Sequence, residues 1–364
     1  MLLDQRLPEG HGDKIAIKIL LMVLALSAAL PSASRAQQAG EAERQVASLE
    51  NEWPDLHARL IGMERAHGAL YGVLVRDRGK VKESDVHALL TRRVSDDAPV
   101  SRPDPEADAG YALLGPRAAQ VIRRAHGFHR EVLAIFASVD AVDRERALSE
   151  AVDRYVSRPE VSLPDVPKDM TILYDHPYTS FVSDAAGPRR KQRYPNLSGF
   201  VWATHWFQLA ALEPLELTTD GDERRRGLTL VADRFHRKLS AGKPPDGFPT
   251  ELPLAPCIAP GLVTMHLRAA AILDNLNMLH AVLTDVLVHP KVDNVRAALT
   301  EAVVRFTDRT YRVVEVDDWI RMALRHSIFA QGGPALGTMT QSERNSSGHL
   351  QHMGGARAPM RGMP

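Results

Sequence analysis

A Glu-x-x-His pair, formed by Glu64 and His67, is the pattern in this sequence that most directly predicts chemistry. At about 100° per residue, both side chains fall on the apolar face of a helix expected over residues 55–76. Helical bundles use this pattern to present a carboxylate and an imidazole to a di-iron or di-manganese centre. Such a centre needs a second copy of the motif and two further carboxylates. Without them, the alternative is a buried Glu and His that bond to each other or to a neighbouring helix.

A second helix, expected over residues 116–137, also presents histidine on its apolar face. His129 lies inside the buried arc, whereas His126 lies near its edge. The two could hold a metal ion from one side. The arginines beside them disfavour a cation, however, and would better suit an anion. These arginines are Arg123, Arg124 and Arg130.

The histidines share one collective property, which is that each of five long predicted helices carries an inward-facing one. Imidazoles combined with a carboxylate suit zinc, iron, copper or manganese better than magnesium or calcium. We therefore predict a transition-metal site of Glu64, His67 and His129, with His280 as a further ligand. For each histidine taken singly, the alternative is a core side chain with a hydrogen-bond partner. The five are His67, His129, His205, His280 and His326.

The C-terminal segment, residues 331–364, contains glycine, serine, proline, methionine and histidine with few residues that could form a core. This composition predicts disorder. Thioether and imidazole ligands together select copper, so His349, His352 and Met353 are candidates for a secondary copper contact. The alternative is an unstructured tail in which methionine has no role.

The N-terminal residues 1–36 are typical of a secretory signal peptide. Lys18 precedes an apolar run that ends before Pro31, and Ser34-Arg35-Ala36 provides small residues for cleavage. A membrane-spanning helix needs about 20 apolar residues, so a permanent anchor is the less favoured alternative. We expect a periplasmic or secreted protein with no transmembrane segment after cleavage.

The composition excludes some classes of function. Lys plus Arg and Asp plus Glu both number 45, so no net charge would attract nucleic acid. The one cysteine, Cys257, cannot form an intramolecular disulfide. We find no nucleotide-binding loop, nucleophile elbow or haem-attachment motif, so the sequence indicates no particular reaction. A third possibility is an enzyme, with its substrate cleft between two groups of helices and beneath the proline-rich residues 158–195.

Apolar residues recur at intervals of three and four, which predicts an all-α fold of one or two helical bundles. An N-terminal helical group is expected over residues 41–157, and a C-terminal group over 196–330. The proline-rich residues 158–195 between them form a linker or lid, in which 171–174 and 178–182 could pair as a hairpin. Residues 95–110 are expected to be a loop.

The helices expected in the N-terminal group cover 41–52, 55–76, 84–94, 116–137 and 141–157, and those in the C-terminal group cover 196–212, 222–240, 261–289, 293–307 and 310–329.

Taken together, these features predict an exported helical protein that binds copper, iron or zinc, for copper handling or as a redox site. The alternative from a different class is a metal-free helical interaction protein that assembles with a partner at the cell envelope.

Overall fold

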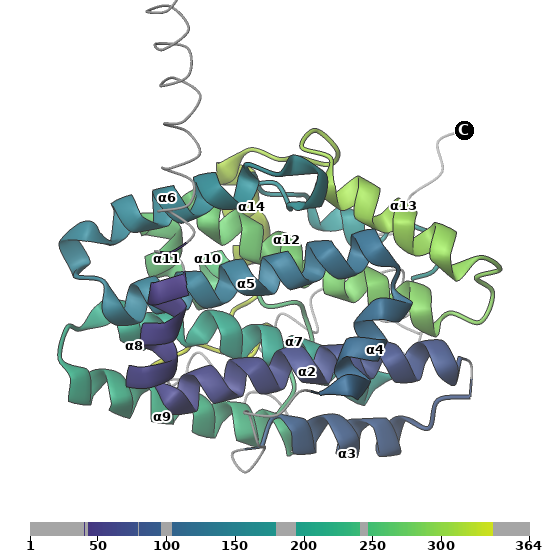
Figure 1. Cartoon of the computed structure of the whole chain (residues 1–364), viewed down its shortest axis with the longest axis horizontal. Helices are drawn as coiled ribbons and strands as arrows, with labels where there is room; N and C mark the ends of the chain where they lie inside the picture. Colours follow the sequence, from purple (N-terminus) through teal and green to yellow (C-terminus); the bar gives the residue numbers. More distant parts are fainter. Residues whose placement is uncertain are drawn as a thin grey trace, which may run out of the picture.

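The computed structural model describes residues 40, 43–78, 80–95, 104–179, 194–240 and 247–337 (Figure 1). The predicted signal peptide lies outside the described residues. So does the tail that contains His349, His352 and Met353. Those predictions are therefore not tested by the structure.

The described part of the chain is all-α, as the sequence predicted. Its one β-type contact is an isolated antiparallel bridge between Lys168 and Val313. Residues 43–52 are helical. The following α-helices are α2 (Pro54–Arg76), α3 (Glu83–Arg93), α4 (Pro105–Leu113), α5 (Pro116–Ser138), α6 (Arg144–Val156), α7 (Pro195–Ala210), α8 (Leu212–Leu217), α9 (Gly221–Leu239), α10 (Ala255–Ile258), α11 (Pro260–Met265), α12 (Leu267–Val288), α13 (Val295–Thr307) and α14 (Val316–Arg325).

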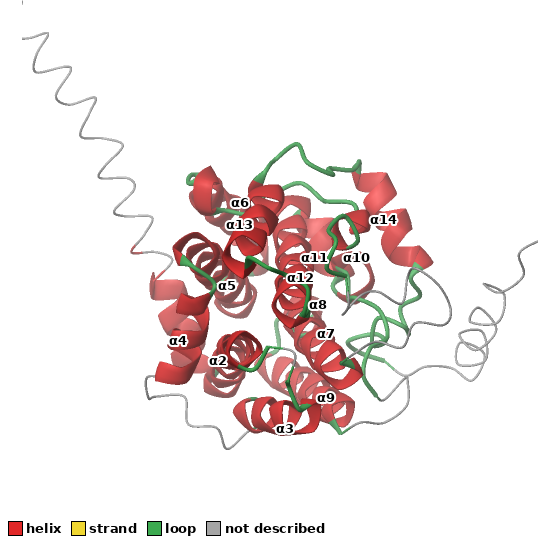
Figure 2. Ribbon diagram, turned by 90° about the vertical axis from the view of Figure 1, so that its right-hand side faces the viewer, coloured by secondary structure: helices red, strands yellow, loops and turns green. Residues whose placement is uncertain are grey.

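Helix α12 lies in the middle of the molecule, and α2, α5, α6, α7 and α13 pack around it (Figure 2). Every residue from Ala269 to Val288 is buried. Its length and apolar composition would also allow it to cross a membrane, but its apolar window is 100% buried inside the protein. An apolar helix without a polar face is what the centre of a helical protein requires.

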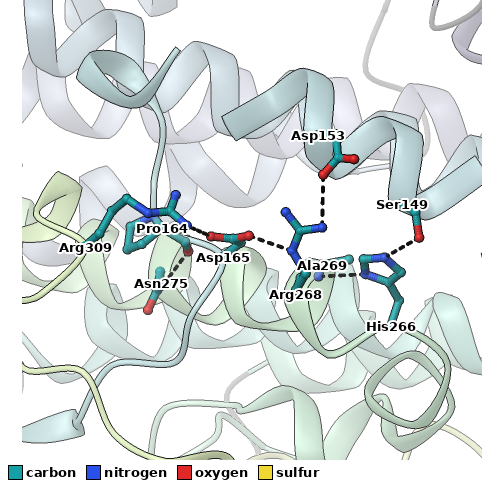
Figure 3. A network of polar contacts seen from close by, with 9 residues as sticks. All are labelled: Ser149, Asp153, Pro164, Asp165, His266, Arg268, Ala269, Asn275 and Arg309. Carbon is teal, nitrogen blue, oxygen red and sulfur yellow. Dashed lines mark hydrogen bonds and ion pairs between the residues drawn. The ribbon is translucent and has the colours of Figure 1, made fainter. Parts of the chain in front are cut away.

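The predicted helix over residues 261–289 is broken in the structure at His266, between α11 and α12. The Nδ1 atom of His266 accepts a hydrogen bond from the Ala269 amide at 3.2 Å, which caps the N-terminus of α12. His266 is therefore a capping residue. It also contacts α6, where its Nε2 lies 3.1 Å from the Ser149 hydroxyl (Figure 3).

Helix α4 is an addition to the predicted elements, because residues 95–110 were expected to be a loop. Asp104 caps it by accepting a hydrogen bond from the Ala107 amide at 3.0 Å, and Pro105 occupies the first turn. Helix α4 packs very closely on α2. A Cβ atom added to Gly110 would lie 1.7 Å from the Gly68 carbonyl oxygen. The two helices can therefore approach this closely only because both positions are glycine.

The described part of the proline-rich segment, residues 158–179, contains only short 3₁₀ turns, at Pro159–Val161 and Met170–Leu173. The second turn occupies the first half of the possible hairpin, so residues 171–174 form no strand. The remaining half extends beyond the described residues. Asp165 fixes this segment to Arg268 of α12 and to Arg309, which follows α13, as Figure 3 shows.

Candidate metal centre

Three buried histidines from three different helices meet beside α12. His67 of α2, His205 of α7 and His280 of α12 each provide one nitrogen, and these nitrogens all lie within 4.8 Å of one another. All three side chains are fully buried. The His205 Nε2 and His280 Nδ1 atoms are 2.9 Å apart, and the His67 and His280 ring centroids are 4.5 Å apart. This three-histidine cluster could hold a metal ion.

His126 of α5 extends the cluster to a fourth helix. Its ring is stacked on His67 with a centroid separation of 5.8 Å, and its centroid lies 5.1 Å from that of His280. The Tyr111 hydroxyl of α4 lies 3.4 Å from His126 Nδ1 and donates to the Glu64 carbonyl at 2.6 Å. The close contact of α4 with α2 thus positions a tyrosine beside His126.

The imidazoles are held in the neutral form that binds metals. Burial lowers the pKa of His67 from 6.5 to about 4. Burial, together with neighbouring histidines, holds the pKa values of His126, His205 and His280 well below the ordinary range. Protons therefore compete weakly with a metal ion at neutral pH.

Each of these four rings also has a buried nitrogen without a hydrogen-bond partner among the described residues. They are Nδ1 of His67 and His205 and Nε2 of His126 and His280. Buried polar atoms in folded proteins are nearly always paired, because an unpaired one loses its interaction with water and gains nothing. In His205 and His280 the unpaired nitrogen is not the one in the mutual 2.9 Å contact, so each ring has a second nitrogen available to a ligand.

Glu64, the first residue of the predicted motif, has a different partner. Its carboxylate forms an ion pair with Arg130 of α5. Burial raises the pKa of the Glu64 carboxyl, although the Arg130 charge acts in the opposite direction. The carboxylate is thus engaged by a cation, and the cluster consists of neutral nitrogen donors.

His129, also a predicted ligand, faces α7. Its Nε2 lies 3.2 Å from the backbone carbonyl of Gln208, which satisfies that nitrogen. Burial lowers the pKa of His129 to about 4, despite the opposing effect of the Gln208 hydrogen bond. Of the predicted ligands in the described residues, His67 and His280 are brought together in the cluster. Glu64 and His129 are bonded elsewhere.

His126 and His205 are additions to the predicted ligand set of Glu64, His67, His129 and His280, although His126 was a possible partner of His129. His205 is one of the five histidines predicted to face inward, and the structure places it in the cluster. His326, the fifth inward-facing candidate, lies outside the cluster and contacts the Glu251 carboxylate at 3.0 Å. A helical wheel identifies the face of one helix, whereas a metal site depends on which faces of different helices meet.

Neutral imidazole nitrogens suit zinc, copper, iron and nickel and do not suit magnesium or calcium. Tetrahedral coordination at 2.0–2.1 Å, the usual Zn–N bond length, places ligand nitrogens roughly 3.4 Å apart. His205 Nε2 and His280 Nδ1, 2.9 Å apart, are at hydrogen-bond distance, so these two rings would have to separate slightly to hold one ion between those atoms. His67 Nε2 lies 3.3 Å from the Thr204 hydroxyl, which leaves Nδ1 as its nitrogen without a partner among the described residues. The chain matches no family model, and neither a curated protein nor a solved structure shows significant similarity to it.

Proposed function

We propose that this protein is an exported metal-binding protein that holds one transition-metal ion between His67, His205 and His280, with copper as the preferred metal. The single observation that supports the proposal is the convergence of three buried histidines from three helices, one ring nitrogen of each lying within 4.8 Å of the others. His126 is available as a fourth ligand. Export rests on the signal-like residues 1–36 of the sequence.

The charge of the site favours copper in its reduced, monovalent form. The ligand set is neutral, since Glu64 is paired with Arg130. Transferring an ion into a dry interior costs a free energy that rises with the square of its charge. A monovalent ion is therefore tolerated here better than a divalent one, and imidazole is a suitable ligand for it. Methionine and histidine residues of the C-terminal tail provide a second copper contact that would deliver the ion.

Metal analysis of the purified full-length protein tests this proposal. The protein is isolated from the periplasmic fraction of bacteria grown with added copper, and its copper, zinc and iron contents are measured by mass spectrometry. We expect about one copper ion per chain. Zinc at one ion per chain would support the site and reject the choice of copper. No metal above background, with none taken up from Cu(I) buffered by bicinchoninate, would reject metal binding.

Two variants test whether the cluster is the site. His205→Gln and His280→Gln each remove one ligand while keeping a polar side chain, so we expect at least tenfold weaker Cu(I) affinity. The matched control is His326→Gln, which changes a histidine that contacts Glu251 away from the cluster. Equal metal loss in the control would show that copper binds elsewhere.

A further inference from the structure

A pocket on the surface of α4 and α5 collects three arginines. Its volume is about 600 Å³, and Arg123, Arg124 and Arg158 line it. Its apolar wall comes from Ala112, Pro116 and Ala119. Ligand sites for small molecules commonly have volumes of about 300–1,000 Å³, with an apolar lining and a few placed polar groups. The pocket has both properties, and it lies at the N-terminal end of α5.

Arg124 is the fixed part of this pocket. Its Nε donates to the Ser162 hydroxyl at 3.0 Å, and its Nη2 donates to the backbone carbonyls of Arg154 and Tyr155 at 2.9 and 2.5 Å. The guanidinium also lies over the Tyr155 ring, 5.2 Å from its centroid. Among the described residues these contacts hold the group in place without a carboxylate, and they involve Nε and Nη2 but not Nη1. A preorganised guanidinium loses little entropy when an anion binds.

Arg123 and Arg158 complete the positive charge at the rim. Arg123 lies over the Tyr111 ring and pairs with Asp108 at 3.2 Å, whereas Arg158 pairs with Glu160 at 3.3 Å. More than half of each of these four charged side chains is exposed. Ion pairs between exposed groups contribute little stability, so an anion could displace either carboxylate. Three guanidiniums against two exchangeable carboxylates leave the pocket positive.

We propose that this arginine pocket binds a small organic anion that combines an oxyanion group, phosphate or carboxylate, with an apolar body. The planar fork of arginine matches both oxyanions, and the alanine and proline wall accommodates a hydrocarbon portion. The pocket is separate from the histidine cluster, so this inference does not depend on metal binding.

Isothermal titration of the full-length protein with hexyl phosphate, hexanoate and inorganic phosphate at low salt tests the proposal. We expect at least one hexyl anion to bind in the millimolar range or tighter, and more tightly than inorganic phosphate, because the wall contributes. The better hexyl anion identifies the headgroup. Absence of binding by both hexyl anions would overturn the proposal, as would equal binding of hexylamine, a cation at neutral pH.

The double variant Arg123→Ala/Arg158→Ala tests the rim arginines. Both side chains are exposed, so the fold should tolerate their removal, and we expect affinity to fall about tenfold, the equivalent of one or two weak charge-assisted contacts. Arg146→Ala is the matched control, since Arg146 is an exposed arginine of α6 that also pairs with carboxylates but does not line the pocket. Unchanged affinity in the double variant, or an equal loss in the control, would overturn the proposal.

Discussion

Burial of neutral histidines makes the metal-free protein sensitive to acid at the scale of single residues. The pKa of His67 is 6.5 when exposed and about 4 in the fold. Above pH 6.5 the ring is neutral in both states, so it adds no pH dependence. As pH falls from 6.5 towards 4, the unfolded chain binds a proton that the folded chain excludes, and the free energy of unfolding decreases. The loss from His67 alone approaches roughly 3 kcal/mol.

Urea denaturation of the metal-free protein at pH 7.5 and pH 5 measures this effect. We expect a clearly lower free energy of unfolding at pH 5, with His126, His129, His205 and His280 adding to the loss. In His67→Gln the difference between the two pH values should shrink by about 2 kcal/mol, because glutamine does not titrate. If His67→Gln keeps the full pH dependence, the lowered pKa of His67 is not a cause of the acid sensitivity.

At the residue scale, the sequence predicted the inward direction of His67 and His280 correctly but not their partners. Glu64 also lies on the inner side of α2, yet Arg130 of α5 reaches its carboxylate. Periodicity within α2 contains no information about the residues that α5 presents to it. The same limit explains why His205 and His126 were left out of the predicted ligand set.

At the scale of elements, the contact of α2 with α4 depends on Gly110. A Cβ atom there would lie 1.7 Å from the Gly68 carbonyl oxygen, a backbone atom that cannot move independently. We therefore expect Gly110→Ala to destabilise the protein by about 3 kcal/mol or more, since the helices must separate. Thermal and urea denaturation measure the change.

The control for this variant is Gly127→Ala in α5, where no atom lies within 4 Å of the added Cβ. Alanine there should stabilise the helix by roughly 0.5–1 kcal/mol, because glycine loses more backbone entropy on folding. Similar effects of the two substitutions would show that the close packing of α2 and α4 is not what limits position 110.

Asp165 holds the proline-rich residues 158–179 in place through ion pairs with Arg268 and Arg309. Burial raises its pKa, but hydrogen bonding to Arg268 and the Arg309 charge outweigh this, so the pKa lies below 3.8. Its stabilising effect is therefore present above pH 3.8 and is lost as pH falls through the lower folded value. We expect Asp165→Asn to cost about 1–3 kcal/mol at pH 7 and to accelerate proteolysis within residues 158–179.

Asp153→Asn is the control, because Asp153 also pairs with Arg268 but its side chain is 68% exposed. A change of less than about 0.5 kcal/mol is expected there, as for most surface substitutions. Equal destabilisation by both variants would mean that Arg268, and not the buried carboxylate, is the group that fixes the segment.

Most elements could be predicted from the sequence because their signals are local. The boundaries of α2, α3 and α5 differ from the expected ones by at most one residue at either end. Helix α4 was missed, although Asp104 and Pro105 supply a helix start, because the surrounding prolines indicated a loop. The break at His266 was missed because a histidine cap is unusual and the apolar pattern continues across it.

At the scale of the whole molecule, the histidine cluster joins the two halves of the chain. His67 and His126 belong to the predicted N-terminal group, and His205 and His280 to the C-terminal group. Helix α12 contacts helices of both groups, including α2, α5 and α7. The cluster therefore forms only when both groups are folded together. A metal ion bound there stabilises the complete fold, since its first and last ligands, His67 and His280, are more than 200 residues apart in the sequence.

This linkage predicts how metal binding changes thermal stability. An ion supplied at 100 times its dissociation constant adds about 2.7 kcal/mol, which corresponds to a rise in Tm of roughly 3–5 °C for a chain of this size. Differential scanning fluorimetry with and without Cu(I), buffered by bicinchoninate, measures the rise. It should vanish in His205→Gln and persist in His326→Gln. Because each variant is compared with its own metal-free form, altered basal stability does not affect the result. A Tm rise that survives His205→Gln would place the ion outside the cluster that spans the two halves.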